Sequence, residues 1–195
     1  MPTPIVLWAC AAVLGFWAVG AYNRLVRLRA GAIAAFAGLA GELSRQVDLV
    51  RKNLPPPEAT MPAALDPEVS IWAGLHAAAA QCAVSLGAAR SRPLEPQGIA
   101  ALDAAREVLD MAWERAERED VHDLAGPRLP DTVIARRAQL ALQTRTAISL
   151  FNQAVDRYNA GIAQFPAVVL AWVFGFKPGL GLDPGTDEPL RQRRP

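Results

Sequence analysis

The chain begins with an uncharged apolar stretch, from Ile5 to Tyr22, that passes directly into a periodic one. Its 18 residues would rise about 27 Å as a helix, close to the thickness of a bilayer's hydrocarbon core. Apolar residues then recur at spacings of three and four, which is typical of one helix face: Leu25, Leu28, Ala32, Phe36, Leu39, Leu43, Val47, Val50 and Leu54. No proline interrupts the run from Ile5 to Leu54, so we predict one helix that leaves the membrane and continues beyond it.

Three further helices follow from prolines and periodicity. Residues 55–57 are all proline and end the first helix, and Asp66 before Pro67 is a helix-start signal. We predict helices over 67–89, 98–119 and from 131 or 132 to 165. The last carries a seam suited to left-handed bundle packing: Ile148, Phe151, Val155, Tyr158, Ile162 and Phe165. The predicted fold is all-α, an N-terminal transmembrane helix continuing into an antiparallel four-helix bundle.

This pattern divides the chain into four parts. Residues 1–22 are the predicted transmembrane anchor, and residues 23–166 are the bundle. Residues 167–182 form an apolar C-terminal segment, and residues 183–195 are a polar tail, rich in proline and arginine, that we expect to be disordered.

Aromatic and basic residues around the apolar stretch predict its place in the membrane. Trp8, Trp17 and Tyr22 are suited to anchoring the span. Three arginines follow it and no basic side chain precedes it, which predicts a single-pass protein of the cell (inner) membrane with the N-terminus outside and the bundle in the cytoplasm. These three, Arg24, Arg27 and Arg29, are also candidates for contact with anionic lipid. A cleaved signal peptide is the alternative, but the stretch is long and no positive charge precedes it.

The apolar C-terminal segment is predicted to return to the membrane. In an up-down-up-down bundle the fourth helix runs back towards the anchor. Trp172, Phe174 and Phe176 would then contact the bilayer surface. The alternative, equally weighted, is that this segment packs over the open end of the bundle.

Three asparagines stand beside aromatic residues on predicted helices, although asparagine is a mediocre helix residue. We interpret Asn23, Asn152 and Asn159 as interhelix polar contacts that fix the register of the bundle. A polar binding groove is the alternative.

No pattern of catalytic, cofactor-binding or metal-binding residues is found in the sequence. His76 lies on an apolar stripe, and Asp120, His122 and Asp123 stand at a helix end where polar residues are ordinary. Glu-x-x-His pairs, a phosphate-binding loop and a nucleophile elbow are all absent from the sequence. The formal net charge of +1 gives no pull towards nucleic acid. We therefore expect no enzyme, no cofactor and no metal.

Two segments of the chain resemble the LemA family of bacterial membrane proteins. They are Tyr22-Asn23-Arg24-Leu25-Val26-Arg27-Leu28-Arg29, followed by Leu43, Arg45 and Asp48-Leu49-Val50, and Phe151-Asn152-Gln153-Ala154-Val155, followed by Tyr158-Asn159, Ile162, Phe165-Pro166 and Phe174-Gly175-Phe176. The chain resembles a divergent member of this family, because it differs from the usual pattern at two places. The family usually has aspartate where this chain has Ala40, and Pro-Asn where it has Arg51-Lys52. The resemblance implies an antiparallel helical bundle behind an N-terminal anchor, and no defined reaction.

The predicted function is that of a non-catalytic scaffold or interaction protein of the LemA type at the membrane. Its partners would be the lipid bilayer and proteins that the sequence does not identify. The alternative is a membrane-organising protein whose copies form homo-oligomers in the membrane plane through the small residues of the first helix.

Overall fold

The computed structural model describes residues 3–54, 67–122, 129–165 and 167–183, without the side chains of 3–7, 10, 11, 67–71 and 119–122. Within these ranges the regular structure is helical throughout, which confirms the all-α class. The helices are α1 (Thr3–Asn53), α2 (Pro67–Ser91), α3 (Pro96–His122), α4 (Asp131–Ala163) and α5 (Ala167–Phe174).

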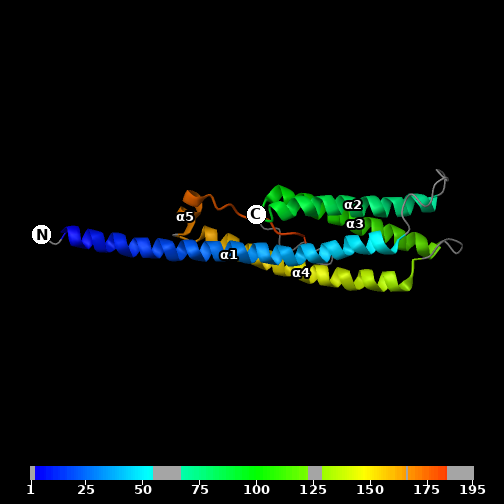
Figure 1. Ribbon diagram of the computed structural model, residues 1–195, viewed down its shortest axis with the longest axis horizontal. Coiled ribbons are helices and arrows are strands. Elements are labelled where there is room, and N and C mark those ends of the chain that lie inside the picture. Colours follow the sequence, from blue (N-terminus) through cyan, green and yellow to red (C-terminus); the bar gives the residue numbers. More distant parts are fainter. Residues whose placement is uncertain (1–2, 55–66, 123–128, 166, 184–195) are drawn as a thin grey trace, which may run out of the picture.

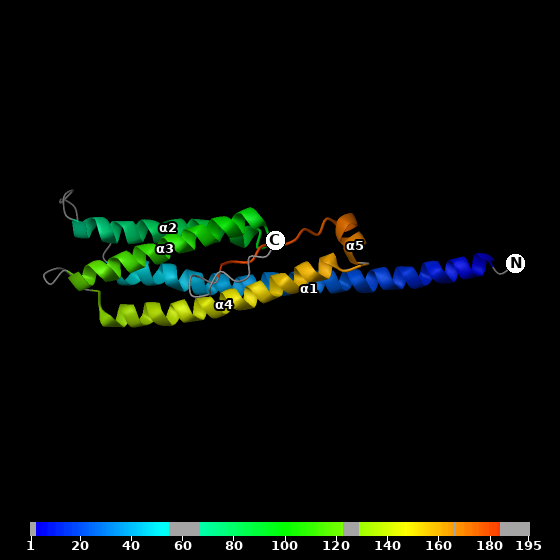
Figure 2. The same cartoon turned by 180° about the vertical axis from the view of Figure 1, so that it is seen from behind.

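Helix α1 is one uninterrupted helix of 51 residues, as its unbroken pattern predicts. Its N-terminal part extends beyond all the other helices, and its second half lies inside the bundle (Figures 1 and 2). The predicted apolar stripe from Leu25 to Leu54 is buried at every position except Leu28, which is half-buried. The stripe is therefore packed against other helices from Leu25 onward, a few residues after the apolar stretch ends.

The bundle consists of two helix pairs. Helix α1 packs along α4 and also against α2, and α2 packs along α3. The core joins buried side chains from all four helices, with Phe36 of α1 set edge-on to Phe151 of α4 at 5.5 Å between ring centroids. Apolar burial along these seams is the main source of stability for such helices.

Helices α3 and α4 meet through long side chains. Arg137 of α4 pairs with Glu117 of α3 at 2.5 Å and lies 5.5 Å over the ring of Trp113. A polar cleft of about 350 Å³ lies beside this contact, lined by residues of both helices. This side of the bundle is thus held by charge and cation–π contacts rather than by a continuous apolar seam.

The predicted seam of α4 is confirmed from Ile148 to Ile162 and wrong at Phe165. The first five positions are buried, but Phe165 is 84% exposed. Helix α4 ends at Ala163, two residues before the predicted end, and Gln164 takes an extended backbone. Phe165 therefore lies beyond the helix and no longer follows its period.

Candidate membrane-facing site

The residues around Tyr22 of α1 meet the end of α4 and α5 where α1 leaves the bundle. The ring of Tyr22 lies 4.9 Å from that of Phe174 and 6.1 Å from that of Phe176. Beneath them, Leu25 of α1 packs with Tyr158 and Ile162 of α4 and with other residues of α5 in a small cluster of their own. The C-terminal segment therefore returns to the foot of the apolar stretch and packs there on α1 and α4, while its contact with a membrane stays a prediction.

Helix α5 has a packed side and an exposed side. Ala171 is buried and Leu170 half-buried against α1 and α4, so this side covers the end of the helix pair. The other side exposes Val168, Val169, Trp172 and Val173, with Trp172 at 84%, and Phe174 is still 57% exposed although its ring contacts that of Tyr22. Phe176 is half-buried among the cluster residues, so of the three predicted contact residues it is a packing residue in this structure.

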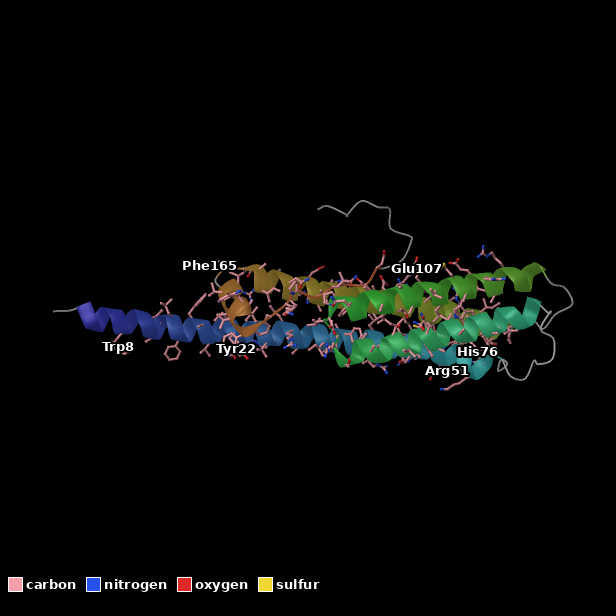
Figure 3. The ribbon with its side chains drawn as sticks, turned by 90° about the horizontal axis from the view of Figure 1, so that it is seen from above. Trp8, Tyr22, Arg51, His76, Glu107 and Phe165 are labelled. Atoms are coloured by element: carbon pink, nitrogen blue, oxygen red, sulfur yellow. The ribbon has the colours of Figure 1, made fainter. Side chains whose placement is uncertain are left out.

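Of the predicted anchor residues, Trp8 and Trp17 lie on the part of α1 before the bundle, and Tyr22 lies where α1 meets α5. Trp8 projects from the extension beyond the bundle, while Tyr22 and Phe165 mark the end of the bundle from which it emerges (Figure 3). Trp8 is 74% exposed and Trp17 42% exposed. Arg24, Arg27 and Arg29 follow, all exposed. Part of the predicted span, residues 5–7, 10 and 11, lies outside the described side chains.

Within the described residues, none of the helices combines the length and the apolar character that crossing a bilayer requires.

Residues 175–183, which we call the C-terminal strap, connect α5 back to the bundle. The strap begins at Gly175, whose φ of 69° is the left-handed conformation that favours glycine. The N–H of Phe176 donates to the carbonyl of Ala171 at 2.9 Å, which closes α5 with the hydrogen bond of a Schellman motif. The strap then runs along the bundle from α5 (Figure 1).

Two asparagines of α4 hold the strap by its backbone. Asn159 donates to the carbonyl of Gly179 and accepts from its N–H, both at 2.9 Å. Asn152 donates to the carbonyl of Leu182 at 2.7 Å and accepts from its N–H at 2.9 Å. A Cβ at Gly181 would lie 2.6 Å from Oδ1 of Asn152, so the close approach requires glycine there.

These contacts correct the prediction of interhelix asparagines. Asn152 and Asn159 bond to an extended segment rather than to another helix, because the strap's backbone has no partner strand and needs donors and acceptors. We call the bonds of Asn152 and Asn159 to the strap the clamp. Asn23 is exposed and takes no part in it. The missed signal was the seven-residue spacing of Asn152 and Asn159, which places both on one face of α4.

Further polar contacts fix the two ends of the strap. The hydroxyl of Tyr158 donates to the carbonyl of Lys177 at 2.8 Å, and burial raises the pKa of this phenol. At the far end, the N–H of Asp183 donates to Asp103 at 3.2 Å, and Arg106 donates to the Asp183 carbonyl at 3.0 Å. The strap is thereby bonded to α3 as well as α4.

The structure describes only one of the side chains that the sequence offered as candidates for chemistry. His76 is half-buried on α2, and the side chains of Asp120, His122 and Asp123 lie outside the description. No group of three metal-ligating side chains occurs in the part of the chain that the structure describes. Burial raises the pKa of the Cys82 thiol to about 11, so little nucleophilic thiolate forms near neutral pH.

Comparison of the chain with protein-family models, with curated proteins and with solved structures found no match. The LemA resemblance therefore stays a prediction.

Replacing Asn159 with alanine should release the middle of the strap. The N–H and carbonyl of Gly179 lose their partner, at a cost of about 1–3 kcal/mol for a buried unsatisfied group. We expect amide hydrogen exchange at Gly179 to accelerate at least about tenfold while the core of α1 and α4 keeps its protection. Gln153→Ala, on the exposed side of α4, is the control and should leave Gly179 unchanged. Equal exchange at Gly179 in the wild type and Asn159→Ala would show that the clamp is unimportant.

Proposed function

We propose that this protein is a single-pass membrane protein of the LemA type whose bundle acts as a non-catalytic scaffold at the membrane surface. The observation that carries the proposal is the exposed apolar face of α5, set beside α1 where an 18-residue uncharged stretch leaves the bundle. Two apolar surfaces from opposite ends of the chain thus share one end of the molecule.

The first support is the shape of α1. An isolated helix extending into water gains nothing from its exposed apolar side chains, and most helix stability comes from packing. Val13, Leu14 and Phe16 are all more than 60% exposed on this extension. Insertion into hydrocarbon would remove these side chains from water and leave every backbone hydrogen bond satisfied.

The second support is the arrangement around the foot of the extension. The exposed side of α5 carries Trp172, and amphipathic aromatic rings favour the membrane interface. Arg24, Arg27 and Arg29 follow at once on the bundle side, which favours a cytoplasmic bundle in a bacterial inner membrane with the N-terminus outside. The LemA resemblance, with its anchored bundle, points the same way.

A second candidate function is homo-oligomerisation in the membrane plane. A groove of about 440 Å³ runs between α1 and α4, lined by Gly31, Ala35 and Gly38 with the exposed Leu150 at its edge. Crosslinking in intact membranes tests it: this function gives discrete multimers of the chain that Gly38→Leu abolishes. Adducts with other proteins alone, unchanged by that substitution, would contradict it and favour a scaffold.

A charge on the extension should prevent membrane insertion. Arginine near the centre of a span costs about 3 kcal/mol relative to leucine, roughly a hundredfold in an insertion equilibrium. We therefore expect Leu14→Arg to shift the chain from the carbonate-resistant membrane fraction to the soluble or peripheral fraction. Leu142→Arg is a matched control, because Leu142 on α4 is 64% exposed and Leu14 is 63% exposed. If both variants fractionate like the wild type, the anchor is wrong.

The exposed side of α5 should lie in the interface of the membrane. A nitroxide at Trp172→Cys, with Cys10 and Cys82 replaced by alanine, should be more accessible to oxygen than to a water-soluble nickel complex in reconstituted vesicles. The same label at Leu150→Cys should show the reverse, because α4 lies in water in this proposal. Identical water-like accessibilities at both positions would exclude α5 as a membrane contact while leaving the anchor in place.

A further inference from the structure

An open cleft lies between three parts of the chain at the membrane-facing end of the bundle. Its walls are α1 at Arg29 and Ile33, the turn between α2 and α3 at Ser91–Gln97, and the strap at Gly175–Pro178. The volume is about 670 Å³, enough for a small ligand or a lipid headgroup. The strap and the α2–α3 turn lie close together in both views of the ribbon (Figures 1 and 2).

The cleft is cationic. Arg29, Arg92 and Lys177 line it, one from each wall, against a single carboxylate, Glu95. Arg92 donates to both carboxylate oxygens of Glu95, each at 3.4 Å, which is long for a charge-assisted hydrogen bond. In the described part of the chain, the side chains of Arg29 and Lys177 have no hydrogen bond or ion pair. Their charges remain available to an anion.

The start of α3 adds backbone donors to the same cleft. Helix α3 begins at Pro96 and has no acidic residue in its first turn. The N–H of Ile99 bonds to the carbonyl of Glu95, while the N–H groups of Gln97 and Gly98 belong to the positions that helices leave without an internal partner. Backbone donors and the positive end of the helix dipole together favour phosphate groups.

We propose that this cleft binds a phosphate-bearing anion between Arg29, Arg92 and Lys177, with the first turn of α3 as additional donor. The phosphate belongs to a soluble compound or to the headgroup of an anionic lipid. Arg29 follows Tyr22 by seven residues, a rise of about 10 Å along α1, which places this wall of the cleft close to the foot of the apolar stretch. Only the lipid source rests on the proposed membrane function; anion binding itself does not.

The strap makes this site depend on the clamp described above. Tyr158 bonds the carbonyl of Lys177, and Asn159 bonds Gly179, so the residues on either side of Pro178 are fixed to α4. Lys177 therefore stands at the cleft because α4 holds its backbone there. Binding of the anion should in turn slow the exchange of the Gly179 amide in the wild type, since the ligand binds the docked strap.

The first test is calorimetric titration of the full chain in non-ionic detergent with inorganic pyrophosphate. The double variant Arg92→Ala/Lys177→Ala should weaken binding at least about tenfold, because each charge-assisted contact contributes about a factor of ten. The double variant Arg51→Ala/Lys52→Ala removes two exposed charges at the far end of α1 and should bind within about twofold of the wild type; Figure 3 marks Arg51 there. Circular dichroism checks that both variants are folded.

The second arm separates the sources of the phosphate. Native mass spectrometry of the chain, released from detergent micelles that contain phosphatidylcholine and phosphatidylglycerol, counts the phosphatidylglycerol molecules that stay bound. If Arg92→Ala/Lys177→Ala loses this lipid and Arg51→Ala/Lys52→Ala keeps it, the phosphate is that of a lipid headgroup. If Arg92→Ala/Lys177→Ala loses pyrophosphate binding but its lipid content is unchanged, the phosphate belongs to a soluble compound. Absence of both ligands in the wild type, or equal losses in cleft and control variants, would overturn the proposal. Leu14→Arg should still bind pyrophosphate, so failure of the anchor is seen separately.

Discussion

Helix α1 is the element from which every other part of the structure is placed. It begins with an uncharged apolar stretch, and from Leu25 onward it carries an apolar stripe that packs against α4 and α2 and is buried at every position except the half-buried Leu28. Before Leu25, most of the side chains that the structure describes on this helix are exposed, and Tyr22 at the end of this part contacts Phe174 and Phe176. Because the helix is continuous, its free part cannot turn back to cover itself. In our proposal, lipid covers the part of α1 that is not packed against other helices.

The strap explains how the opposite end of the chain reaches the same place. Helix α5 has only eight residues, too few to be stable alone. It is held by its contacts with Tyr22 and by a strap whose backbone is bonded to α4 through Asn152, Asn159 and Tyr158. The strap also forms one wall of the cationic cleft. One set of hydrogen bonds therefore supports the apolar face of α5 and the position of Lys177.

Much of the bundle was predictable from the sequence, because apolar positions on α1 and α4 repeat at the helix period and prolines mark most ends. The prediction is wrong at Phe165 because it assumes that Pro166 marks the end of the helix. Helix α4 ends at Ala163, two residues before the predicted end, so Phe165 does not continue its buried face. The strap was not predicted, since extended backbone without a strand partner has no periodic signal. Asn152 and Asn159 were recognised as structural, but nothing in their own segment indicates that their partner is backbone near Gly179 and Leu182. The sequence alone indicates that the arginines after the apolar stretch could contact anionic lipid. Arg92 and Lys177 lie near Arg29 only in the folded chain, so the sequence does not predict the cationic cleft.

The central claim is that one helix is embedded in lipid at its start and in the bundle at its end. Amide hydrogen exchange along α1, measured on the full chain in lipid nanodiscs, tests this claim most directly. The account predicts slow exchange without a gap from residue 5 to residue 53, with lipid protecting the part before Tyr22 and the bundle protecting the rest. Exchange before Tyr22 as fast as in an unprotected helix in water would contradict it.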